Sequence, residues 1–115
     1  MQAPAQAEAR VVLCTVPNEA VAESLARALL EAGLAACVNI VPGVRSLYRW
    51  QGKIEDDREL LLVIKTQAAR YAELEERIRA LHPYAVCEVL AFEVAAGSPP
   101  YLAWLLGETA HSQDR

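Results

Sequence analysis

The most apolar run of the chain is ELLLVIKT, residues 59–66, which holds five consecutive apolar side chains from Leu60 to Ile64. A strand with one face in water alternates apolar and polar residues, because successive side chains point to opposite faces. The run breaks that alternation, and VVL at 11–13 and VLAF at 89–92 do the same. The pattern predicts a sheet that is apolar on both faces.

A strand and a helix are expected before this run. Residues 10–16 (RVVLCTV) are apolar and rich in β-branched side chains, which is typical of a buried strand. Asn18 then stands where a helix N-cap is expected, and apolar residues recur every four positions from 21 to 29. Gly33 suits the left-handed position just past the C-terminal end. Together they predict a helix between Asn18 and Gly33.

A long antiparallel hairpin is expected to contain the apolar run as its second strand. The first strand lies within residues 35–50, and Gln51-Gly52 provides the turn. Pro42-Gly43 interrupts that first strand. Because proline cannot donate to a sheet ladder, the dipeptide predicts a bulge in an edge strand.

Three further elements are expected after the hairpin. Apolar residues at helical spacing predict a helix over 68–82, which Pro83 ends by removing a backbone donor. Residues 86–94 (VCEVLAFEV) predict a fourth strand. Ser98 is the expected N-cap of a last short helix that begins with two prolines.

The order strand, helix, strand, strand, helix, strand, helix predicts one α+β domain. It is the ferredoxin-like, split β-α-β arrangement (βαββαβ) with an extra C-terminal helix. The domain is expected to span residues 10–110 of the 115, with disordered tails at 1–9 and 111–115.

Such a fold leaves one apolar face of the sheet bare, because both central helices cover the other. Each buried aliphatic side chain contributes about 1.5–3 kcal/mol. Half a dozen of them would therefore match the whole stability of a small domain, roughly 5–15 kcal/mol. The sequence predicts a homo-oligomer assembled through the sheet. The alternative is a monomer in which the C-terminal helix covers the face.

Composition excludes several classes of protein. A formal charge of −4 and a pI of about 5.1 argue against nucleic-acid binding, which depends on basic groups. No apolar run approaches the ~18 residues of a membrane span. Three cysteines without a Cys-x-x-Cys pair, and no secretory signal at the N-terminus, predict free thiols in the cytoplasm. No Ser-His-Asp spacing or glycine-rich phosphate loop is present, so no enzymatic activity is expected.

Five motifs run in order through nearly the whole domain: VLCTVP (12–17), GLAACVN (33–39), SLYRWQGKI (46–54), LHPY (81–84) and YLAW (101–104). In these motifs the chain resembles the CutA divalent-cation tolerance family. The resemblance implies a homotrimer with an architecture similar to PII signalling proteins. It also implies a role in tolerance to copper and other divalent cations, with no organic cofactor.

The resemblance assigns copper ligands to Cys14 and His82. A thiolate and an imidazole suit copper or zinc but do not complete a coordination shell, so Glu88 or a neighbouring subunit would have to contribute. Leu81 stands where some relatives have a second histidine, and Cys87 where relatives usually have proline. Cys14, in an apolar strand, is alternatively a packed small hydrophobe.

A second set of residues predicts a cleft between subunits that binds a small molecule or a partner protein, as in PII-like signalling or scaffold trimers. Aromatic side chains with a few charges commonly line such sites. The set comprises Trp50, Lys65, Tyr84, Tyr101 and Trp104. The alternative is that Trp50 and Trp104 anchor the trimer interface, where aromatic residues are enriched.

Overall fold

A computed structural model of the chain describes residues 8–110, so the expected tail at 111–115 and residues 1–7 of the expected tail at 1–9 lie outside the described residues. The strands are β1 (Ala9–Val16), β2 (Cys37–Trp50), β3 (Lys53–Gln67) and β4 (Leu90–Glu93), and the helices are α2 (Glu19–Glu31), α3 (Ala68–Leu81) and α4 (Pro99–Glu108). The predicted α+β fold and its order of elements are confirmed. β1 begins one residue before the expected domain boundary.

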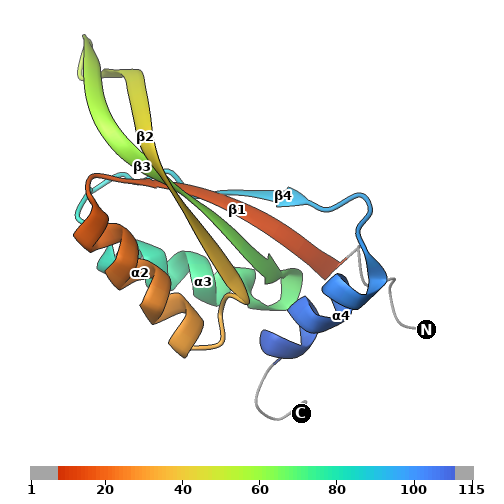
Figure 1. Cartoon of the computed structure of the whole chain (residues 1–115). Coiled ribbons are helices and arrows are strands. Elements are labelled where there is room, and N and C mark those ends of the chain that lie inside the picture. Colours follow the sequence, from red (N-terminus) through yellow and green to blue (C-terminus); the bar gives the residue numbers. More distant parts are fainter. Residues whose placement is uncertain (1–7, 111–115) are drawn as a thin grey trace.

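The ELLLVIKT run lies on β3, inside a four-stranded antiparallel sheet of order β2-β3-β1-β4 (Figure 1). Val12, Cys14 and Val16 on β1 are fully buried and pack with α2 and α3. In register with them, Leu62 and Ile64 of β3 are buried on the same face. The alternate residues point to the opposite face, which carries neither α2 nor α3.

Local signals set the ends of α2 and α3. Asn18 caps α2, because its Oδ1 accepts a hydrogen bond from the Val21 N–H at 2.9 Å. Gly33 follows the last turn at φ +69°, a conformation that glycine adopts without steric cost. α3 ends at Leu81, one residue before the predicted end at 82, and Pro83 follows its C-cap His82.

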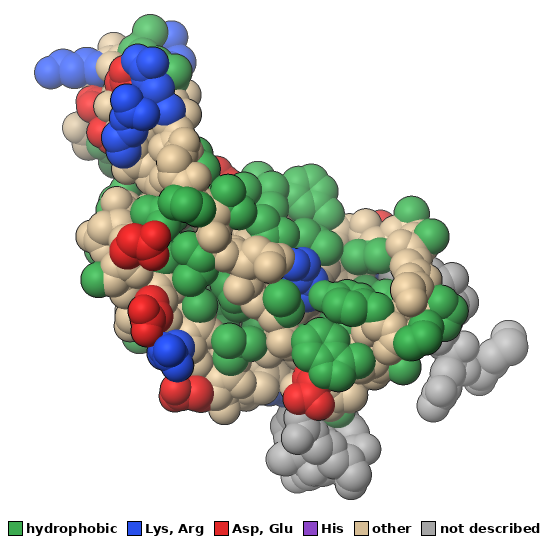
Figure 2. Space-filling model, in the orientation of Figure 1, with side chains coloured by type: hydrophobic (Ala, Val, Ile, Leu, Met, Phe, Trp, Pro, Cys, Tyr) green, Lys and Arg blue, Asp and Glu red, His purple; other side chains and the backbone are tan. Residues whose placement is uncertain are grey.

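β2 and the first half of β3 extend beyond the body as a two-stranded arm, defined here as residues 44–59 (Figure 1). The predicted bulge is present, since the register shifts between Val41 and Val44. At the arm's tip, Gln51 and Gly52 both have positive φ, which matches the twist of a two-residue hairpin turn. Figure 2 shows charged side chains gathered near this tip and large apolar areas on the body.

One expectation about the C-terminal third is wrong, and a second holds only in part. The strand expected over 86–94 is limited to β4, because only four residues pair with β1 and the preceding segment turns toward the base of the arm. Ser98 occupies the N-cap position of α4, as predicted, but its side chain makes no capping hydrogen bond. Pro99 and Pro100 open that helix and carry no N–H, so the Tyr101 N–H is the first that a capping side chain could satisfy.

α4 covers only one end of the open face of the sheet. There it buries Ala9 beneath Leu102 and Leu105. The Gln67 side-chain amide also donates to the Leu106 carbonyl at 3.0 Å and to the Thr109 hydroxyl at 2.7 Å. The rest of the face stays uncovered: Leu90 and Phe92 on β4 are 53% and 50% exposed.

Candidate functional site

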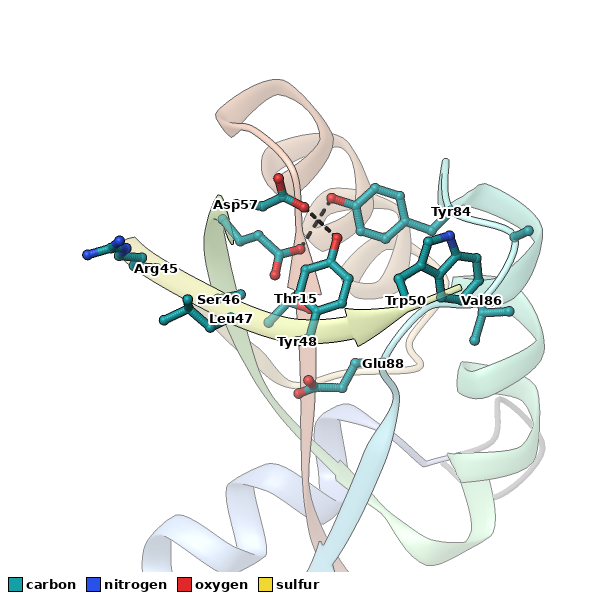
Figure 3. A pocket seen from close by; sticks show the side chains of 12 residues that line it. Thr15, Arg45, Ser46, Leu47, Tyr48, Trp50, Asp57, Tyr84, Val86 and Glu88 are labelled. Carbon is teal, nitrogen blue, oxygen red and sulfur yellow. Dashed lines mark hydrogen bonds between the residues drawn. The ribbon is translucent and has the colours of Figure 1, made fainter. Parts of the chain in front are cut away.

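A cavity of about 670 Å³ lies where the arm leaves the body (Figure 3). It is lined by one residue of β1, by residues of both arm strands and by the segment that follows α3. The lining residues are Thr15, Arg45, Ser46, Leu47, Tyr48, Trp50, Asp57, Glu59, Tyr84, Ala85, Val86 and Glu88.

Two tyrosines in this cavity donate hydrogen bonds to carboxylates. Strand alternation puts Tyr48 and Trp50 on the same side of β2. Asp57 lies opposite Ser46 in register, so Tyr48 reaches Asp57 Oδ2 across the diagonal of the ladder. This hydrogen bond raises the pKa of Tyr48 to about 12, which keeps the phenol protonated at neutral pH.

The second pair joins the segment after α3 to the root of the arm. Tyr84 Oη donates to Glu59 Oε2 at 3.2 Å, and Glu59 is only 7% exposed. Burial raises the pKa of Tyr84, and the negative charge of Glu59 raises it further. In Figure 3, the hydroxyls of Tyr48 and Tyr84 point toward one another on the side of the cavity where Asp57 lies.

The cavity is acidic. Asp57, Glu59 and Glu88 contribute carboxylates. Arg45 is the one basic residue among the described residues that line the cavity, and Asp56 outside the lining binds it through bonds of 2.9 and 2.6 Å. The guanidinium holds the pKa of Asp56 below its usual value, so this pair is neutral as a unit.

His82 fixes the segment that carries Tyr84. Its imidazole Nε2 lies 2.8 Å from the Thr15 carbonyl oxygen, and Nδ1 accepts the Tyr84 N–H at 3.1 Å. Since a carbonyl can only accept, the proton sits on Nε2. The ring also packs on Tyr84, with centroids 4.8 Å apart. Both nitrogens of this buried histidine are therefore engaged.

The residues assigned to copper by resemblance do not fit a metal ion in the single chain. Cys14 is fully buried in the core, and burial raises the pKa of its thiol to about 12, with a further contribution from Cys87 and Glu88. His82 has no free nitrogen. Within residues 8–110, no three His, Cys, Asp or Glu side chains gather closely enough to hold a metal. Glu88 lines the cavity.

The residues predicted to share a cleft separate into two groups. Trp50 and Tyr84 line the cavity. Lys65 lies on the open face of the sheet, where Nζ donates to the Asn39 amide oxygen. Tyr101 and Trp104 form a ring pair on α4, with centroids 5.5 Å apart and nearly half of each side chain exposed. The single chain therefore does not unite the five residues in one cleft.

The sequence interpretation missed Asp57 and Glu59 as cavity residues. The signal available was alternation: two acids two positions apart on an arm strand face the same side, and β2 presents Tyr48 and Trp50 with the same spacing. The approach of Tyr84 depends on the path of residues 83–89, which no local pattern specifies.

The comparisons with known proteins are consistent with one another. The family model of the CutA1 divalent ion tolerance protein matches residues 10–108. The chain is 54% identical to the divalent-cation tolerance protein CutA of Thermus thermophilus over 99 residues, covering 86% of this chain and 96% of the relative. It is 46% identical to human protein CutA, covering 96% of this chain and 61% of the relative.

Solved structures give the same result. The Cut A1 structure from Thermus thermophilus matches with a TM-score of 0.87 and 53% identity, covering 89% of this chain and 99% of that one. CutA1 from Oryza sativa matches with a TM-score of 0.89 and 42% identity, covering 95% of this chain and 100% of that one.

The names of the relatives do not agree on a cellular compartment. A CutA structure from Archaeoglobus fulgidus, with a TM-score of 0.85 and 34% identity over 88% of this chain and 98% of that one, is titled periplasmic. An Arabidopsis thaliana relative, 46% identical over 86% of this chain and 54% of its own length, is named chloroplastic. In this chain, no helix within residues 8–110 has the length and apolar character to span a membrane. On the family model and the relatives together, the chain belongs to the CutA1 divalent ion tolerance protein family.

Proposed function

We propose that the chain serves divalent-cation tolerance as a homotrimer without catalytic activity, in the cytoplasm. The observation that carries the assembly is the uncovered apolar surface, which comprises the open face of the sheet and the arm. Leu47 and Ile54 on the arm are 62% and 74% exposed, and Leu90 and Phe92 add a second apolar area. Monomeric proteins seldom leave contiguous apolar surface of this kind in water.

A second copy of the chain can bury this surface, whereas the short helix α4 covers only one end of it. The arm projects away from the body, so its apolar side chains can be buried only against another molecule (Figure 1). β2 and β4 are also the two edge strands of the sheet, and unpaired edges favour pairing with a further chain. The number of three copies comes from the resemblance to the family.

Sedimentation equilibrium tests the assembly. We expect a mass three times the 12.6 kDa of the chain at micromolar concentration. Phe92→Glu puts a charge on the open face and should dissociate the assembly. Leu30→Glu, at an exposed leucine of α2 (42% exposed, against 50% for Phe92), is the matched control and should leave the mass unchanged. A wild-type mass of one chain would refute the proposal.

The thiols support the proposed cytoplasmic location. Cys14, Cys37 and Cys87 are all free, and a reducing compartment maintains cysteines in that state. Fractionation of cells that produce the untagged chain is the direct measurement, and recovery with an extracytoplasmic fraction would contradict the proposal.

Copper binding at Cys14, His82 and Glu88 remains the prediction of the sequence, and a titration tests it. Because the ring nitrogens of His82 are engaged and the Cys14 thiol is buried, we expect copper(II) to bind Cys14→Ser/His82→Gln and wild type with equal affinity. An affinity loss of about tenfold or more in the double variant would restore these residues as ligands.

A second function is favoured by the cavity at the base of the arm. Its volume of about 670 Å³ lies within the roughly 300–1,000 Å³ typical of small-molecule sites. We therefore propose that the assembled protein also binds a small ligand there. Thermal-shift measurements with a ligand collection test this function, since a bound ligand stabilises the native state.

A further inference from the structure

The walls of the cavity are aromatic on two sides. Trp50 and Tyr48 extend from β2, and Tyr84 extends from the segment after α3 (Figure 3). The face of an aromatic ring attracts cations through its negative π-electron density, and tryptophan does so most strongly. Three such rings around one space favour a positively charged occupant.

The charges of the cavity select the same kind of ligand. Asp57, Glu59 and Glu88 supply negative charge, and the charge of Arg45 is already met by Asp56. Glu59 is 7% exposed, so its charge acts with little screening by solvent. An anionic ligand such as a phosphate ester would meet repulsion here and find no free guanidinium or ammonium group among the described lining residues.

The same geometry favours an organic cation over a metal ion. Asp57 and Glu59 each accept a phenol hydrogen bond, and within residues 8–110 no three metal-ligating side chains converge. A metal ion would need several of these oxygens at once, at about 2.0–2.6 Å. Guanidinium and ammonium groups need only hydrogen-bond distances, and an attached apolar stem can contact Val86 at the cavity edge.

We infer that this cavity binds a small organic cation, an alkylguanidinium or alkylammonium compound, between the three aromatic rings and the three carboxylates. The inference rests on the small-ligand function proposed above and names the class of ligand. Glu88 is exposed and accepts from the head group at the mouth of the cavity, while Trp50 stacks on it.

Calorimetric titration of the full-length chain in its native assembly tests this inference. The probes are n-butylguanidinium, the neutral n-butylurea and the anionic butyrate. We expect n-butylguanidinium to bind at least tenfold more tightly than n-butylurea, and butyrate not to bind, since about 1.4 kcal/mol of charge-assisted hydrogen bonding is a factor of ten. Salt should weaken the binding.

Three variants identify the residues. Glu88→Gln should lower the affinity for n-butylguanidinium about tenfold, because one charged acceptor is lost. Trp50→Leu should lower this affinity by a similar factor. Glu76→Gln, which removes the same charge from the exposed side of α3 away from the cavity, should bind as wild type does. Sedimentation of each variant shows whether it keeps the wild-type mass.

The outcomes distinguish failure of the proposed ligand class from failure of the small-ligand function itself. If n-butylurea or butyrate binds as well as n-butylguanidinium, the cavity is a ligand site but the ligand class is wrong. If Glu88→Gln and Glu76→Gln behave alike, the cation binds elsewhere and the inference fails. If no probe binds while thermal shift identifies another ligand whose binding Trp50→Leu abolishes, only the ligand class fails. If no compound binds at all, the small-ligand function fails with it.

Discussion

His82 shows how one buried side chain positions another. Its ring bridges β1 and the segment after α3, through the Thr15 carbonyl and the Tyr84 N–H. Tyr84 in turn reaches Glu59 in the cavity. The histidine therefore acts on the cavity through Tyr84 and is not itself one of the residues that line it.

Replacing His82 should test this structural role. His82→Ala leaves the Thr15 carbonyl and the Tyr84 N–H without their partner, so we expect a loss of about 1–3 kcal/mol in the free energy of unfolding. His82→Gln retains a side-chain N–H donor at a similar distance and should recover part of that loss. Urea denaturation gives the values, and equal stability of His82→Ala and wild type would contradict the role.

The three cysteines should differ in reactivity. Burial raises the pKa of the Cys14 thiol from 9.0 to about 12, so at pH 8 the thiolate fraction falls from roughly one in ten to about one in ten thousand. We expect iodoacetamide to leave Cys14 unmodified in the native protein and to label it in urea, as read by peptide mass spectrometry. Native labelling of Cys14 at the rate seen in urea would show that the thiol is accessible.

At the scale of elements, the arm depends on its two-residue turn. Gln51 and Gly52 have φ of 51° and 79°, and β2 and β3 pair on either side of them. A side chain in the left-handed region costs about 1–2 kcal/mol, which glycine avoids. The turn thus fixes the register that puts Tyr48 and Trp50 on the cavity side.

A pair of glycine substitutions tests this dependence. Gly52→Ala should lower the free energy of unfolding by about 1 kcal/mol, because alanine resists positive φ. Gly107→Ala is the matched control: it lies inside α4 with no atom within 4 Å of an added Cβ, and should stabilise by up to about 1 kcal/mol. Chemical denaturation measures both, and changes of the same sign would contradict the argument.

Elements with local signals were predictable, and those without them were not. Asn18, Gly33 and Pro83 fix the ends of α2 and α3 through backbone chemistry that the sequence displays. β4 could not be delimited, because it begins only where the segment after α3 returns to β1, although β1 itself continues to Val16. The approach of Tyr84 to Glu59 joins residues 25 positions apart and depends on tertiary structure alone.

At the scale of the whole molecule, the arm and the open face pose the same problem. Both leave apolar side chains in water, and α4 covers only the end of the sheet near Ala9 and Gln67. The cavity lies between them, since β1 and the root of the arm both contribute to its lining. Assembly of copies over these surfaces would therefore also define the surroundings of the cavity.

If assembly contributes to stability, unfolding must include dissociation, and the stability must depend on protein concentration. We expect the thermal midpoint of the wild type to rise when the concentration increases by roughly a hundredfold. Phe92→Glu should have a lower midpoint that no longer depends on concentration, because a charged side chain on the open face opposes burial. Leu30→Glu, on α2 and away from the open face of the sheet, should keep the wild-type dependence of the midpoint on concentration. Calorimetry on the three proteins measures the thermal midpoints. If the wild-type midpoint did not depend on concentration, each chain would be stable without its neighbours. That result would contradict the burial argument on which the assembly rests.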